Sequence, residues 1–238
     1  MKLLSRSMLV FAASMCIASS ASAQSAKNAI QISNLTLIEQ TASTPGLWVT
    51  ILGAVDASDP NAVTIHTSQL KDLLFSVSLE CGLYTRTLAR SKGGEKDTAT
   101  AEVRVQVRVL LDPGTPEQRI AEPGVVTFCE RLQTLSATLQ GIIGNLACFP
   151  GGVFDPNAPG CNLTPEEIEL VLNTLEANAF FFSLDDVGAG THNVVVQARI
   201  RSATSVQEGE AEALGLIGKG TVVVEEIRLV KGRSITIQ

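Results

Sequence analysis

Aromatic residues are scarce in this chain of 238 residues, which contains one Trp, one Tyr and 4% aromatic residues in all. Sugar-binding sandwiches stack sugar rings on exposed aromatic side chains, so this scarcity argues against a stacking-type lectin. The single tryptophan, Trp48, lies in the apolar run LWVTIL. We therefore expect Trp48 in the core and not as a platform for a ligand.

Histidine and nucleophile motifs are also scarce. The chain has two histidines, no G-x-S-x-G elbow and no C-x-x-C pair, so neither a standard hydrolase motif nor the spacing of a structural zinc site is present. His66 lies in the alternating run VTIHT and His192 follows a Gly-rich turn, and we expect structural roles for both. A hydrolase whose site is assembled from distant segments stays an alternative.

No segment offers the roughly 20 uninterrupted apolar residues that a membrane-spanning helix needs. At the start of the chain, Lys2 and Arg6 precede a short apolar stretch that ends in an A-x-A exit at Ala23. This pattern predicts a signal peptide over residues 1–23, cleaved to leave residues 24–238. We expect a secreted or periplasmic protein without a transmembrane segment after cleavage.

The chain is acidic, with 18 basic and 24 acidic residues and a net charge of -6. Loss of Lys2 and Arg6 with the signal leaves 16 basic residues against 24 acidic ones, a net charge of -8. A negative field disfavours nucleic acid and anionic lipid as partners. The expected partner is an extracellular or periplasmic ligand or protein.

Four of the five cysteines lie beyond the predicted signal peptide, an even number that indicates two disulfides in an oxidising compartment. Of the three possible pairings we favour Cys148 with Cys161, because the segment between them is rich in Gly and Pro and bends easily. That choice leaves Cys81 to pair with Cys129.

Alternating apolar and polar residues dominate from about residue 30 to residue 111, and again after residue 180. Val103, Val105, Val107 and Val109, for example, alternate with polar residues, as in a strand with one buried face. The pattern predicts one mainly β domain, an antiparallel β-sandwich of the jelly-roll or Greek-key type.

Residues 130–178 show a different spacing, with leucines and isoleucines every three or four positions. Thr164, Pro165 and Glu167 match the T-x-x-E capping box that opens a helix. We therefore expect a small two-helix insertion at residues 130–178 with a disulfide-bounded loop.

Four segments, KDLLFSVSLECGLYT, VTFCERLQTLSATLQGIIG, LTPEEIELVL and GTHNVVVQARI, give the chain a resemblance to uncharacterised exported microbial β-rich proteins. That group has no assigned activity, so the resemblance implies a coherent exported β-rich fold and no particular function.

Two groups of polar residues are candidate binding sites. Asp56, Asp59 and Asn61, in DASDPN, offer loop oxygens of the kind that calcium binds, although turn chemistry alone also explains them. The segments TAEVRVQVRV and THNVVVQARI carry four arginines on polar strand faces, which either pair with acids such as Glu102 or bind an anion: Arg104, Arg108, Arg199 and Arg201.

The absence of catalytic motifs favours an exported, non-catalytic binding or structural protein without a required cofactor. A dispersed-site hydrolase and a calcium-dependent ligand binder are the alternatives.

Overall fold

The computed structural model describes residues 28–33 and 46–229, so the predicted signal peptide lies outside the described residues. Within these ranges no helix is long and apolar enough to cross a membrane. The elements, in chain order, are β1 (Asn28–Ser33), β2 (Val49–Leu52), β3 (Val63–Thr67), β4 (Lys71–Ser91), β5 (Lys96–Leu111), β6 (Arg119–Ile120), β7 (Val126–Thr138), β8 (Ile142–Ile143), the 3-10 turns η1 (Leu146–Cys148) and η2 (Pro150–Gly152), β9 (Leu163–Thr164), β10 (Glu166–Val187), β11 (Gly190–Val206) and β12 (Glu210–Ile227).

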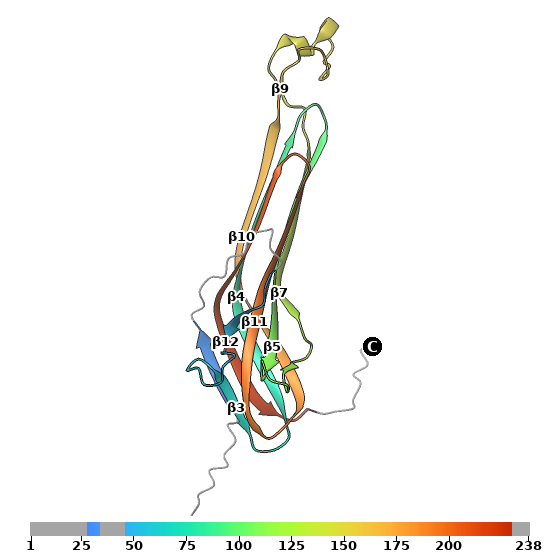
Figure 1. The fold of residues 1–238 in the computed structure, drawn as a ribbon. Coiled ribbons are helices and arrows are strands. Elements are labelled where there is room, and N and C mark those ends of the chain that lie inside the picture. The colour runs from blue at the N-terminus through green and yellow to red at the C-terminus, as the bar shows by residue number, and fades with distance from the viewer. Residues whose placement is uncertain (1–27, 34–45, 230–238) are drawn as a thin grey trace, which may run out of the picture.

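Most strands form two antiparallel sheets that pack face to face into an elongated sandwich (Figure 1), and β8 and β9 pair as a separate two-stranded sheet. Sheet A has the order β1-β12-β4-β10. Sheet B has the order β2-β11-β5-β6, with β3 also on β11 and β7 also on β5. The mainly β, antiparallel fold predicted from the alternating residues is therefore confirmed.

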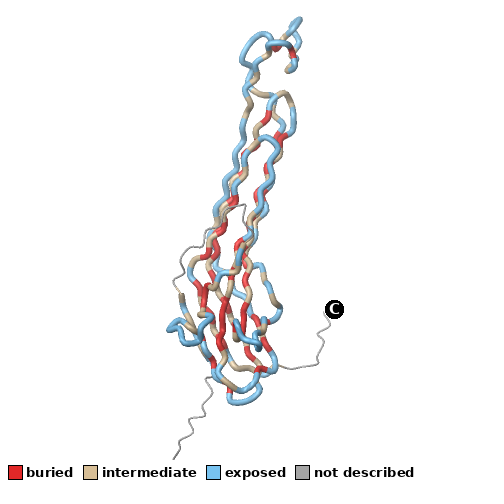
Figure 2. The backbone as a smooth tube through the Cα atoms, viewed as in Figure 1, coloured by how far each residue is buried: buried red, intermediate tan, exposed pale blue. Residues whose placement is uncertain are grey.

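The molecule has three regions along its length. The base contains residues 28–33, 46–78, 105–129, 179–200 and 221–229, the stalk contains residues 79–104, 130–138, 166–178 and 201–220, and the tip contains residues 139–165. Burial is densest in the base and becomes patchy along the stalk (Figure 2).

The base is filled by large apolar side chains. Phe75 and Phe182 from sheet A are at most 1% exposed, as is Ile65 from sheet B. The alternating valines of β5 point into this core, because successive side chains on a strand face opposite sides. Burial of this apolar surface is the main stabilising contribution at this end of the molecule.

The interior of the stalk is narrower and more polar. Gly215 of β12 faces sheet B so closely that an added Cβ would lie 3.1 Å from Cγ2 of Val103 and 2.5 Å from Cγ2 of Ile200, at the upper end of the base. Gln133 bridges the two sheets by accepting a hydrogen bond from the Thr85 hydroxyl at 2.6 Å and donating to the Thr87 hydroxyl at 2.7 Å. Its amide also donates to the Leu170 carbonyl at 2.8 Å, so the buried polar atoms of Gln133 have partners.

Both predicted disulfides are present. Cys81 of β4 is bonded to Cys129 of β7, with 6.5 Å between their Cα atoms, so this bond joins the two sheets where the base meets the stalk. Cys148, the last residue of η1, is bonded to Cys161 and closes the loop that contains η2 at the tip.

The predicted two-helix insertion at residues 130–178 is wrong. The described chain has no α-helix there, and residues 130–138 and 166–178 belong to β7 and β10. β10 pairs with β4 from Glu166 to Val187, a run of long-range hydrogen bonds that overrides the local helical spacing. Pro165 ends the tip one residue before β10 and opens no helix.

Candidate functional site

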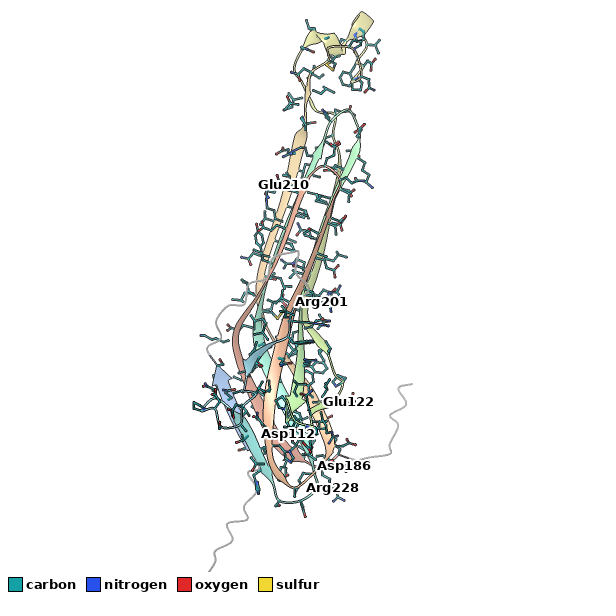
Figure 3. All side chains as sticks on the ribbon, viewed as in Figure 1. Asp112, Glu122, Asp186, Arg201, Glu210 and Arg228 are labelled. Carbon is teal, nitrogen blue, oxygen red and sulfur yellow. A yellow bond between two sulfur atoms is a disulfide. The ribbon has the colours of Figure 1, made fainter. Side chains whose placement is uncertain are left out.

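The four arginines singled out in the sequence come together on the outer side of sheet B. β5 and β11 are neighbours, and their register places Arg104 opposite Arg201, Arg108 opposite Gln197, and Arg199 opposite Gln106. Directly opposed residues of an antiparallel pair share one face. We call Trp48 together with these residues of β5 and β11 the arginine–tryptophan face: Trp48, Gln106, Arg108, Gln197, Arg199 and Arg201. Arg201 lies near the middle of the elongated molecule, at the upper end of this face (Figure 3).

Trp48 lies on two of the arginines. The residue directly precedes β2, which pairs with β11 through Val49 and Ala198, and this pairing brings the indole to the sheet. The guanidinium carbons of Arg108 and Arg199 are 4.3 Å and 4.5 Å from its ring centroid. Both distances fit cation–π contacts. Trp48 is half-buried on the outer face, so the expectation of a core position is wrong.

Glutamines hold the two stacked guanidinium groups in place. Arg108 donates from Nε and Nη2 to Oε1 of Gln197, at 3.0 Å and 2.7 Å. Arg199 donates from Nε to Oε1 of Gln106 at 2.9 Å. A guanidinium has five N–H donors, so both side chains keep donors without an acceptor among the described residues. The glutamines fix the geometry and leave the charge uncompensated.

Arg104 differs from the other three arginines because it is ion-paired. Arg104 is paired with Glu102 and with Glu130, the second at 3.2 Å, as expected for a solvated strand face. Within the described ranges, no carboxylate lies within 4.0 Å of Arg108, Arg199 or Arg201. The predicted pairing with acids is therefore confirmed only for Arg104.

Burial places the stacked arginines in an unfavourable environment for their charge. Desolvation lowers the pKa of Arg108. Desolvation lowers the pKa of Arg199 as well, and the charges of Arg201 and Arg108 lower it further. Arginine stays protonated in proteins, so the cluster carries positive charge that an anion would stabilise. Carboxylate, sulfate and phosphate groups match the planar donor fork of arginine.

The two histidines face opposite sides of sheet B. His66 Nδ1 lies 3.1 Å from the Thr191 hydroxyl on the exposed side. His192 Nδ1 lies 2.8 Å from Oδ2 of Asp112, and its Nε2 lies 2.9 Å from the Gly188 carbonyl oxygen. Because both ring nitrogens of His192 already have acceptors, neither is directed at a nucleophile. His66 thus contacts a hydroxyl and His192 contacts a carboxylate, and among the described residues neither histidine contacts both groups.

The proposed calcium ligands serve the turn in which they lie. Oδ1 of Asp56 accepts from the backbone and the hydroxyl of Ser58, and these bonds, the hydroxyl first, lower the pKa of Asp56. Oδ1 of Asp59 accepts from the backbone and the side chain of Asn61. Among residues 28–33 and 46–229, no group of three or more His, Cys, Asp or Glu side chains could hold a metal ion.

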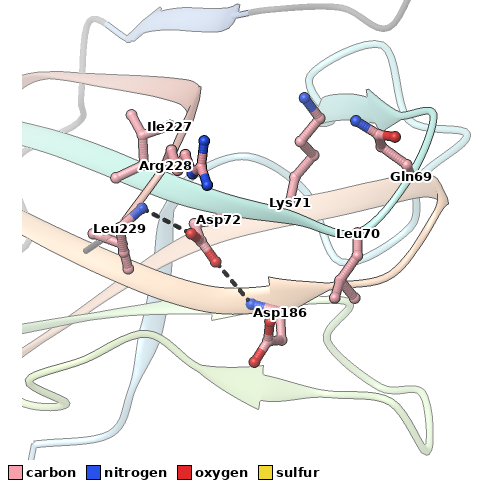
Figure 4. A pocket seen from close by; sticks show the side chains of 8 residues that line it. All are labelled: Gln69, Leu70, Lys71, Asp72, Asp186, Ile227, Arg228 and Leu229. Carbon is pink, nitrogen blue, oxygen red and sulfur yellow. Dashed lines mark hydrogen bonds between the residues drawn. The ribbon is translucent and has the colours of Figure 1, made fainter. Parts of the chain in front are cut away.

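A cavity of about 460 Å³ opens at the far end of the base and is lined in part by Lys71 and Arg228 (Figure 4). The carboxylate of Asp72 accepts the backbone N–H groups of Asp186 at 3.1 Å and Leu229 at 2.8 Å. This carboxylate therefore joins strand ends. The arginine–tryptophan face is the better defined site.

No family model and no curated protein matches the chain. Structural similarity extends to capsid structures of infectious bursal disease virus. The Gx strain structure is 10% identical, with a TM-score of 0.18 over 85% of this chain and 40% of the viral chain. The VP2 subviral particle is 11% identical, with a TM-score of 0.18 over 86% and 43% of the two chains. The chain spans about two fifths of the length of these viral proteins.

Proposed function

We propose that the protein is an exported, non-catalytic binding module that binds an anionic ligand at the arginine–tryptophan face. The observation that carries this proposal is the set of three arginines, Arg108, Arg199 and Arg201, without a carboxylate partner within 4.0 Å among the described residues of an acidic chain. The two disulfides support the export part of the proposal.

The site is organised before a ligand arrives. Arg108 and Arg199 lie on adjacent central strands of sheet B, and each is fixed by a glutamine and by Trp48. Side chains that are already ordered lose little conformational entropy on binding, which favours affinity. A repeating anion, such as an acidic polysaccharide, could contact the stacked pair and the exposed Arg201 at once.

The experiment measures the binding of dextran sulfate to the protein isolated after export, with neutral dextran as the control ligand. The mass of its N-terminal peptide should show Gln24 as the first residue. We expect dextran sulfate to bind to the protein, and we expect this binding to weaken as the salt concentration rises, because salt screens exposed charges. Double replacement of Arg199 and Arg201 by Gln should weaken binding by roughly tenfold or more, a free-energy change of about 1.4 kcal/mol.

The matched control is the double replacement of Arg86 and Arg90 by Gln, which removes the same two charges from the outer face of sheet A, where both arginines are paired with glutamates. This variant should bind like the unmodified protein. Equal loss of binding in this control would show that the effect depends on net charge alone and would contradict the proposed site. Absence of any binding to dextran sulfate, together with no response to polyglutamate, would contradict the anionic ligand itself.

A further inference from the structure

β10 is a long edge strand that lacks the basic residues and prolines which often protect an edge. The strand order leaves β10 at the end of sheet A, paired with β4 and, at Ser183, with Glu122 through a single bridge. Its 22 residues include no Lys, Arg or Pro. Native proteins place such residues on exposed edges, because an unprotected edge pairs with other strands.

The free backbone groups of β10 can be identified from one contact. Near the base, Ser183 exchanges two hydrogen bonds with Glu122, at 2.9 Å and 3.0 Å, so its backbone N–H and C=O point away from β4. Hydrogen-bonding direction alternates along an antiparallel strand. Every second residue before Ser183 therefore presents its backbone groups to the open edge: Glu167, Glu169, Val171, Asn173, Leu175, Ala177, Ala179 and Phe181. No backbone partner is found for these groups among the described residues.

Apolar side chains flank the open edge on both faces. Leu175 and Phe181 are 70% and 63% exposed on the outer face of sheet A. Ile168, Leu172 and Phe180 point toward the other side and are 44%, 42% and 38% exposed. A strand added here would bury apolar surface on both of its faces.

Two acids at the tip-proximal end of β10 are ion-paired within the chain. Glu167 is paired with Arg90 at 2.6 Å, and Glu169 is paired with Arg86. Glu166 accepts the Gly141 N–H at 2.8 Å. Glu176 has no ion pair among the described residues, so a second strand with the same sequence would meet one uncompensated carboxylate per copy in the segment 167–181.

We propose that β10 pairs antiparallel with β10 of a second copy of this chain, with the two-fold axis at Thr174. This register uses every open backbone position from residue 167 to residue 181, because Thr174 is their midpoint. Ile168 of one copy then lies opposite Phe180 of the other, a β-branched and aromatic pair that stabilises a sheet. No glutamate lies opposite a glutamate in this register. The β10 sequence is thus complementary to itself, and two copies of sheet A join into one continuous sheet.

The test is the mass of the disulfide-bonded protein in solution, measured by light scattering over a range of concentrations. The unmodified protein should shift from monomer to dimer as its concentration rises. Leu175→Lys adds a charge at the edge, and Ala177→Pro removes an N–H that the monomer does not use. Each variant should weaken dimerisation by roughly tenfold or more and keep the melting temperature of the monomer.

The matched control is Leu132→Lys, since Leu132 is 65% exposed on β7, an edge strand of sheet B. This variant should dimerise normally. A protein that stays monomeric at all concentrations overturns the proposal. Dimers that survive both β10 substitutions, or that Leu132→Lys disrupts equally, also overturn it.

Discussion

The base and the stalk share the same long strands but are filled with different kinds of residue. Of the twelve largest fully buried side chains, nine lie in the base and three, Leu79, Val103 and Ile217, lie in the stalk. Of the seven buried polar residues, five lie in the stalk, namely Thr85, Thr87, Ser91, Asp97 and Gln133. The base is therefore stabilised mainly by apolar burial, whereas the stalk depends on hydrogen bonds and close approach of the sheets.

Small residues allow the two sheets to approach each other closely in the stalk. Ala99 and Ala101 of β5 and Ala213 of β12 lie within the stalk, and all three are fully buried. Alanine contributes little apolar surface, so a stalk of this width gains little from burial. The disulfide between Cys81 and Cys129 at the lower end of the stalk adds a covalent link between the sheets. Such a link reduces the conformational freedom of the unfolded chain.

The largest expected effect comes from removing a large side chain from the base. Phe75→Ala should lower the free energy of unfolding by about 3–5 kcal/mol, because Phe75 is fully buried and its loss leaves a cavity. Phe181→Ala, at a position 63% exposed, should cost less than about 0.5 kcal/mol in the monomer. Urea unfolding of both variants checks the difference. Similar losses at the two positions would show that the base is not the apolar core of the molecule.

A smaller effect is expected in the stalk, where polar contacts replace apolar burial. Gln133→Leu should lower the free energy of unfolding by about 1–3 kcal/mol, because the buried hydroxyls of Thr85 and Thr87 lose their partner. Replacing these two threonines by valine in the same protein should recover much of the loss, since no buried polar group is then unpaired. Urea unfolding of the single and triple variants measures this recovery. A triple variant less stable than Gln133→Leu would contradict the proposed cause.

The sequence predicts the base well because strand alternation there is strict. Val105, Val107 and Val109 alternate with polar residues and are fully buried. In β10 the same rule fails, because an edge strand exposes both of its faces and carries apolar residues on each. Leu170, Val171 and Leu172 are consecutive and all exposed, and such a run imitates the spacing of a helix.

The candidate site was only half predictable for a similar reason. The alternation in β5 and β11 places Arg108 and Arg199 on a polar face, and the structure has them there. The contact with Trp48 could not be predicted, because it depends on the pairing of the short strand β2 with β11. An apolar run around a single tryptophan is as compatible with a core position as with a position on the outer face of a sheet. Only the pairing register between β2 and β11 distinguishes a position of Trp48 on the outer face from a position in the core.

The smallest expected effect concerns a single buried carboxylate at the upper end of the stalk. Oδ2 of Asp97 accepts the N–H of Arg90 at 2.7 Å, and Oδ1 accepts the N–H groups of Thr98 at 2.8 Å and Glu208 at 3.0 Å. Asp97 thereby ties the β4–β5 hairpin to the turn before β12. Burial alone would raise the pKa of Asp97, but the hydrogen bonds from Arg90, Glu208 and Thr98 and the charge of Arg90 lower it overall.

A carboxylate whose pKa is lower in the folded protein stabilises that state above its unfolded pKa of about 3.9, and the contribution is lost as the pH falls through the folded value. Asp97→Asn should therefore be less stable than the unmodified protein at neutral pH, and the gap should narrow below about pH 4. Urea unfolding across this pH range measures the gap, with Glu117→Gln as a control that removes an exposed carboxylate. A gap that stays constant down to acid pH would show that Asp97 acts through packing and not through its charge, and the stalk would then resemble the base more closely than its hydrogen bonds indicate.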